Sequence, residues 1–132
     1  MDASKQNSWL DRKKIQDWVV TTVLYLVTMV LGLLAFVAMP DIARLLVALT
    51  AAQAPNVNSV QARGMVSTAR NVSTMLAGLL FLAVAVGGME FHFRHRGKRR
   101  SYRIFAWTIG IEIAIIIAHQ ILKAVVIEGL LA

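Results

Sequence analysis

This 132-residue chain is 58% hydrophobic and 16% charged, and it contains no cysteine. Soluble domains are typically about 45–50% apolar and about 25% charged, so this composition argues against an ordinary soluble domain, and the lack of cysteine excludes disulfides and thiolate metal sites. The net charge of +7 does not indicate nucleic-acid binding, because six of the 14 Lys and Arg residues lie in residues 94–103, between two apolar runs. Basic residues in that position set membrane topology.

The first predicted elements are a polar tail over residues 1–17 and a membrane span over residues 18–39. The span contains no charged residue, and its length gives about 33 Å of helix, enough to cross a hydrocarbon core of about 30 Å. We read this run as a retained span because no small-residue cleavage site follows it. Pro40 predicts the end of the helix, since the residue before a proline is disfavoured in the helical region.

Residues 40–71 are predicted to form an outer loop that carries a short amphipathic helix over residues 41–54. Asp41 is a candidate N-cap, apolar residues recur after it at spacings of three and four, and Pro55 ends the pattern. The segment is too short to span the membrane. We expect it to lie on the membrane surface or on a partner.

A second span is predicted over residues 72–93, and it is rich in small residues. Two of them, Ala83 and Gly87, are four residues apart, a spacing that lets another helix approach closely. The alternative is that these small residues have no packing role, since a membrane span simply tolerates glycine. The residues that we expect to pack against another helix are Gly78, Ala83, Gly87 and Gly88.

Residues 94–103 are predicted to form a basic loop with Gly97 at its turn, and Glu90 is expected to pair with Arg94. The distribution of basic residues places the N-terminus and this loop in the cytoplasm, and the 40–71 loop and the C-terminus outside, as expected for a multi-pass protein of the inner (cytoplasmic) membrane. The cluster either only sets topology, or also contacts anionic lipid or a partner subunit. Its members are Arg94, Arg96, Lys98, Arg99, Arg100 and Arg103.

The third span, predicted over residues 104–127, carries three charged or titratable residues at helical spacing, Glu112, His119 and Lys123. Glu112 would lie about 12 Å from the start of the span, near the middle of the hydrocarbon. Such a polar stripe is too costly to face lipid, so we expect it to face protein or water. One hypothesis is a hydrogen-bonded clamp to a partner helix, assisted by hydroxyls of the first span (Thr21, Thr22, Tyr25 and Thr28). The other is a path for protons or ions.

The sequence predicts no catalytic, cofactor or metal site within this chain alone. The predicted depths of His92 and His119 differ too much for one haem iron to bind both, and no metal-binding spacing occurs within a span. We therefore expect a non-enzymatic protein whose only bound molecules are structural lipids. A b-type haem that His119 would hold together with another chain is a weaker alternative.

These features favour a small accessory subunit of a large multi-subunit membrane complex, with other integral membrane subunits and anionic lipids as partners. Energy-transducing complexes commonly carry small helical subunits, so a respiratory, quinol-oxidising or photosynthetic host is expected. The alternative is a small homo-oligomeric, proton-coupled transporter or channel that uses Glu112.

Overall fold

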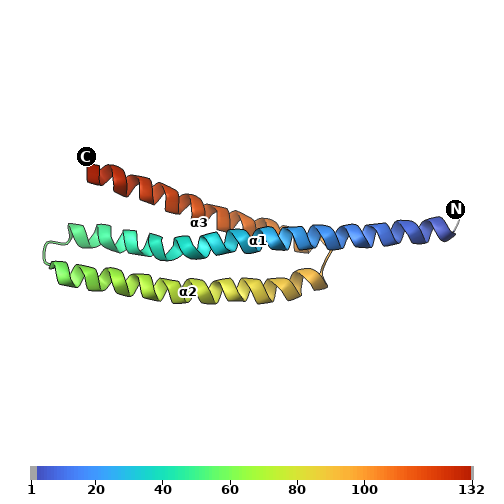
Figure 1. Ribbon diagram of the computed structural model, residues 1–132, viewed down its shortest axis with the longest axis horizontal. Helices are drawn as coiled ribbons and strands as arrows, with labels where there is room; N and C mark the ends of the chain where they lie inside the picture. The colour runs from blue at the N-terminus through green and yellow to red at the C-terminus, as the bar shows by residue number, and fades with distance from the viewer. Residues whose placement is uncertain (1–2, 132) are drawn as a thin grey trace.

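The computed structural model describes the backbone of residues 3–131 and the side chains of residues 8–129. This part of the chain is all-helical, with three helices and short connections between them: α1 (Ala3–Gln53), α2 (Ser59–Arg94) and α3 (Arg99–Leu131) (Figure 1). All three helices are long and apolar enough to cross a membrane. The predicted all-α, three-span architecture is confirmed, and it is that of a multi-pass membrane protein.

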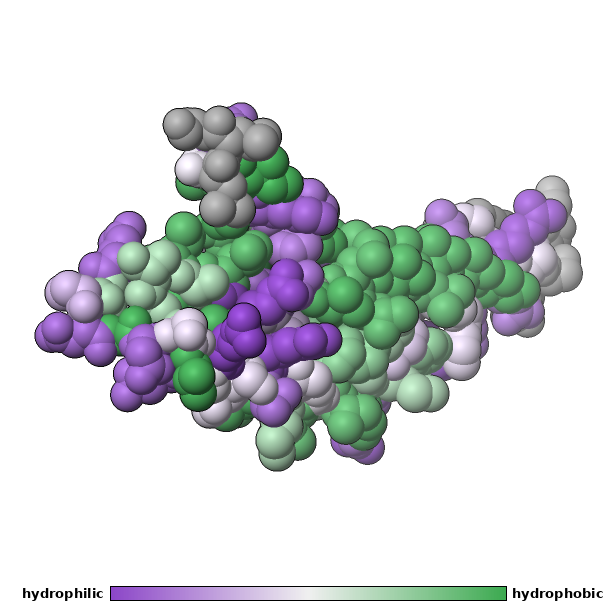
Figure 2. Space-filling view, turned by 60° about the vertical axis from the view of Figure 1, so that its left-hand side comes forward, coloured by the Kyte–Doolittle hydropathy of each residue, from purple (hydrophilic) through white to green (hydrophobic). Residues whose placement is uncertain are grey.

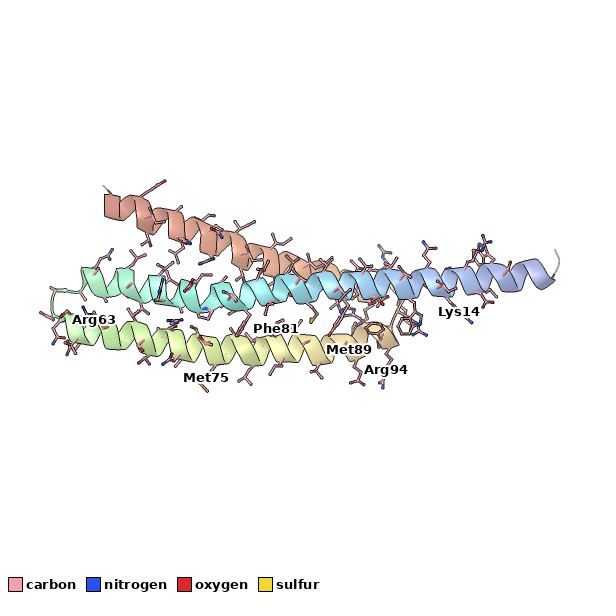
Figure 3. All side chains as sticks on the ribbon, viewed as in Figure 1. Lys14, Arg63, Met75, Phe81, Met89 and Arg94 are labelled. Atoms are coloured by element: carbon pink, nitrogen blue, oxygen red, sulfur yellow. The ribbon has the colours of Figure 1, made fainter. Side chains whose placement is uncertain are left out.

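The three helices are arranged with α1 between α2 and α3 (Figure 1). α2 runs antiparallel to α1 along much of its length, whereas α3 runs parallel to α1 and diverges toward its C-terminal end. The N-terminal part of α1, which carries Lys14, projects beyond the other two helices (Figure 3). α2 and α3 each pack mainly on α1 and make few contacts with each other.

The predicted break at Pro40 is wrong, because α1 continues through this residue to Gln53. A proline within a helix removes one backbone hydrogen bond and crowds the preceding turn. Pro40 and the preceding Ala38 are buried, and Asp41, the residue after the proline, contacts His119 of α3. The predicted helix over residues 41–54 exists, but it is the end of α1 and not a separate element.

The predicted outer loop is also shorter than expected, since only residues 54–58 lie outside the helices. Asn58 caps α2 by accepting a hydrogen bond from the Gln61 backbone at 2.8 Å, and the Gln61 side chain accepts one from the Asn58 backbone at 3.3 Å. This reciprocal capping box is readable in the sequence. It begins α2 well before the predicted span, so residues 59–71 form helix rather than loop.

The end of the molecule where α1 joins α2 extends beyond the hydrophobic surface of the three helices. With 51 and 36 residues, these helices are about 76 Å and about 54 Å long, against a hydrocarbon core of about 30 Å. Arg63 lies near this end (Figure 3). Figure 2 shows hydrophilic residues gathered at this end and at the N-terminal projection, with a broad hydrophobic surface between them.

The basic connection between α2 and α3 is reduced to residues 95–98. Arg94 therefore belongs to α2, and Arg99, Arg100 and Arg103 belong to α3. Gly97 makes the predicted turn with a φ of +72°. A Cβ atom at this position would lie 2.5 Å from Asp17 Oδ2 of α1, so the turn needs glycine both for its backbone conformation and for its close approach to α1.

Small residues allow the helices to approach, and a few aromatic contacts fix their register. The buried hydrophobic residues of the described chain are Ala35, Ala38, Ala51, Ala77 and Phe105. Tyr25 of α1 donates a hydrogen bond to the Ala85 carbonyl of α2 at 2.7 Å, and the Trp18 and Phe93 rings are 5.2 Å apart. So small a core leaves most of the apolar side chains on the outside of the bundle.

Candidate functional site

Glu112 is the buried carboxylate of α3, and it packs against the middle of α1. Only 7% of the Glu112 surface is exposed. A Cβ atom at Gly32 would lie 2.9 Å from Glu112 Oε1, so glycine at this position makes room for the carboxylate. The second oxygen, Oε2, is buried and has no hydrogen-bond partner among the described residues.

Glu112 lines a cavity of about 270 Å³ to which all three helices contribute. α1 provides Gly32 and Phe36, α2 provides Phe81, and α3 provides Thr108 beside Glu112. The two phenyl rings are 6.1 Å apart, and Phe81 points from α2 toward α1 (Figure 3). Among the residues that line the cavity, Glu112 is the one titratable side chain, so a single carboxylate is set into an apolar, partly aromatic space.

A second cavity of about 230 Å³ adjoins the first, because Val84 and Thr108 line both. Tyr25, Thr28 and His92 contribute its polar atoms. The two cavities follow the opening between α2 and α3, from the α2–α3 connection toward Glu112.

His92 ties the end of α2 to the start of α3. The residue is 4% exposed, its Nδ1 lies 2.7 Å from Ser101 Oγ, and its ring stacks on Phe105 with 3.4 Å between ring centroids. Sequence analysis placed His92 at the end of a span but missed this contact, because the partners come together only through the turn at Gly97. The geometry gives His92 a structural role at the helix junction.

The predicted polar stripe on α3 is divided between two surroundings. Glu112 faces Gly32, whereas His119 Nε2 lies 3.6 Å from Asp41 Oδ2 of α1. Asp41 Oδ1 in turn lies 3.9 Å from the Arg44 side chain. Lys123 is exposed. The stripe therefore includes one isolated buried carboxylate and one cross-helix contact, and Asp41 is the partner of His119 that sequence analysis missed.

The hydroxyls of α1 do not form the clamp to Glu112 that the sequence suggested. Thr22 and Thr28 donate to the carbonyls of Trp18 and Leu24 within α1, and the Tyr25 hydroxyl is engaged by α2. Thr21 Oγ1 is buried without a hydrogen-bond partner among the described residues. Threonine in a helix commonly bonds to its own backbone, which explains why Thr22 and Thr28 do not reach across to α3.

The small residues of α2 separate into packed and open positions. A Cβ atom at Gly78 would lie 3.6 Å from Phe36 of α1, and one at Gly88 would lie 3.9 Å from His92. Ala83 and Gly87 are exposed, and a Cβ atom at Gly87 would have no neighbour within 4 Å. Of the predicted packing residues, Gly78 therefore lies at the contact between α2 and α1, whereas Ala83 and Gly87 are not covered by another helix of this chain.

The outer face of α3 carries a longer series of small residues that sequence analysis missed. Ala106, Gly110, Ala114 and Ala118 recur at every fourth position and are all exposed. Three of them, with Trp107 and Ile111, line a shallow groove of about 420 Å³. We call this surface the α3 groove. It lies opposite the buried face of α3, which carries Ser101, Phe105 and Glu112.

The basic cluster lies at the α2–α3 connection, where part of it is engaged within the chain. Arg94 pairs with Glu90 at 3.2 Å, which confirms the predicted ion pair. The Arg96 guanidinium lies 4.7 Å from the Trp18 ring centroid, and that of Arg100 lies 5.9 Å from Phe91. Lys98, Arg99 and Arg103 are exposed. No group of three or more His, Cys, Asp or Glu side chains in the described chain is placed to hold a metal ion.

Comparison with protein-family models, with curated proteins and with solved structures gives no match to this chain. The α3 groove, the Glu112 cavity and the basic cluster are the features of the described chain from which a function can be inferred.

Proposed function

We propose that this protein is a small accessory subunit of a larger membrane complex, and that it joins the complex by docking a partner's transmembrane helix into the α3 groove. The single observation that supports this most strongly is the groove itself. In a lipid environment the hydrophobic effect does not drive helices together, so association depends on close packing at small residues. Four small residues at every fourth position provide such a surface along about 18 Å of helix.

The exposed side chains around the groove fit the same proposal. Trp107 is 67% exposed and Ile111 is 56% exposed, and both border the groove. Large side chains beside a small-residue groove give a docking helix both close backbone approach and side-chain contact area. The groove faces away from α1, so a partner helix can bind there without displacing any helix of this chain.

The proposed subunit is oriented with the N-terminus and the 95–98 connection in the cytoplasm. The basic residues at this connection support that orientation. Lys98, Arg99 and Arg103 have exposed side chains, and we propose that they contact anionic lipid headgroups or a partner there. A respiratory, quinol-oxidising or photosynthetic host complex stays a prediction, as does a haem shared through His119.

The experiment is to purify the tagged chain from its native membrane in mild detergent and to measure its native mass, for the wild type and two variants. We expect a heteromeric complex much heavier than 14.5 kDa for the wild type. Gly110→Leu should release the partner because it fills the groove. Gly129→Leu is the matched control, since a Cβ atom at either glycine would have no neighbour within 4 Å and Gly129 lies about 28 Å farther along α3.

Circular dichroism of each variant shows whether the helices are retained, so that loss of assembly is separated from unfolding. A wild-type chain that runs as a monodisperse monomer would overturn the proposal. A small symmetric oligomer containing only this chain would instead favour the transporter or channel alternative.

A further inference from the structure

The Glu112 cavity presents a carboxylate that nothing in the described chain neutralises. Glu112 is more than nine-tenths buried, and among the described residues its Oε2 has no hydrogen-bond partner and no basic side chain lines the cavity. The nearby cationic candidates are directed elsewhere, because His119 contacts Asp41 and Lys123 is exposed. A carboxylate at membrane depth is costly unless a proton or a cation compensates it. The compensation has to come from a proton or from a cation that enters the cavity.

The rest of the cavity restricts what kind of cation fits. A metal ion prefers several oxygen ligands at once, and this cavity offers one carboxylate and the Thr108 hydroxyl among otherwise apolar side chains. The rings of Phe36 and Phe81 border it, and aromatic faces attract organic cations, quaternary ammonium groups in particular. The volume of about 270 Å³ suits a small organic molecule, and the adjoining cavity of about 230 Å³ extends the space along α2 and α3.

We propose that this cavity binds a lipophilic organic cation, with the charged nitrogen against Glu112 and the apolar part of the molecule between Phe36 and Phe81. Such a compound partitions into the membrane and reaches the cavity through the opening between α2 and α3. Gly32 is a positioning residue in this site, because its lack of a side chain leaves room for Glu112 Oε1. This inference goes beyond the proposed accessory role and does not depend on the α3 groove, which shares only Ile111 with the residues that line this cavity.

The test is isothermal titration of the full chain in mild detergent, together with any partner that co-purifies. The probes are benzyltrimethylammonium and neopentylbenzene, its neutral carbon analogue of nearly the same shape. We expect the cation to bind more tightly than the neutral analogue. Glu112→Gln should weaken cation binding by about tenfold or more, the change expected when an ion pair in a low-dielectric site loses its negative charge, and should leave the neutral analogue unaffected.

Two further variants keep the test decisive. Glu128→Gln removes an exposed carboxylate of the same helix and should bind the cation as the wild type does. If Glu112→Gln fails to fold, Glu112→Asp retains the charge on a shorter side chain, and it should still prefer the cation over the neutral analogue. Equal binding of the two probes to the wild type, or equal cation affinity of wild type and Glu112→Gln, would overturn the proposal. So would a complex in which a partner's basic side chain already occupies Glu112 and the cation does not bind.

Discussion

Replacement of Gly97 by alanine should destabilise the protein by about 2–3 kcal/mol. The φ of +72° at Gly97 costs an alanine about 1–2 kcal/mol, because its Cβ atom crowds the following carbonyl oxygen in the left-handed region. The new Cβ atom would also lie 2.5 Å from Asp17 Oδ2 and 2.9 Å from Asp17 Cγ. Overpacking typically costs about 1–3 kcal/mol. Because the Asp17 carboxylate can rotate away from the new Cβ atom, we expect this second contribution to be at the low end of that range.

A double-mutant cycle separates the two contributions to the Gly97→Ala effect. Asp17→Ala removes the carboxylate that the new Cβ atom meets, so Gly97→Ala in that background should cost only the backbone part, about 1–2 kcal/mol. The assay is unfolding in mixed micelles, followed by circular dichroism as the denaturing detergent increases. Gly64→Ala is the matched control: Gly64 lies within α2 and a Cβ atom there would meet nothing within 4 Å, so alanine should stabilise by about 0.5–1 kcal/mol. A Gly97→Ala protein as stable as the wild type would refute the left-handed turn, and an equal cost of Gly97→Ala in both backgrounds would refute the close approach of this turn to α1.

Two further predictions concern topology and the helix junction. Single cysteines at Asn56 and Lys98, both exposed and outside the helices, should be labelled by a membrane-impermeant maleimide from opposite sides of the membrane; labelling from one side would contradict the three-span arrangement. His92→Ala and Ser101→Ala should each destabilise the α2–α3 junction, and a cycle between them should give a coupling of about 0.5–1.5 kcal/mol for the lost hydrogen bond. Additive effects of the two substitutions would show that the contact at 2.7 Å contributes nothing to stability.

The spans were predictable from the sequence because their signal is long and redundant. Each of the three apolar runs is long enough to cross a bilayer as a helix, and a helix satisfies all of its backbone hydrogen bonds within the segment. The end of the first helix was predicted wrongly because the proline rule is local. It considers the backbone around Pro40 and takes no account of the packing of Ala38 or of the Asp41–His119 contact, which depends on how α3 lies against α1.

The candidate site was predictable in part. The depth of Glu112 indicated a buried group, but its neighbour Gly32 is 80 positions earlier in the chain, and only the register between α1 and α3 brings the two together. The His92–Ser101 contact likewise depends on the geometry of the turn at Gly97. The α3 groove differs from both, because the spacing of Ala106, Gly110, Ala114 and Ala118 is visible in the sequence. What the sequence does not give is which face of α3 is already covered by α1.

Site-specific cross-linking from the α3 groove tests the proposed role most directly. The chain has no cysteine, so a benzophenone maleimide attached to Ala114→Cys reports on that position alone. Met75→Cys is the control, because Met75 is 70% exposed and points away from α1 on the far side of α2 (Figure 3). On illumination in native membranes, Ala114→Cys should join this chain to a different membrane protein, and Met75→Cys should do so far less. A product at only twice the mass of this chain, or equal cross-linking from both positions, would contradict docking of another protein's helix in the α3 groove.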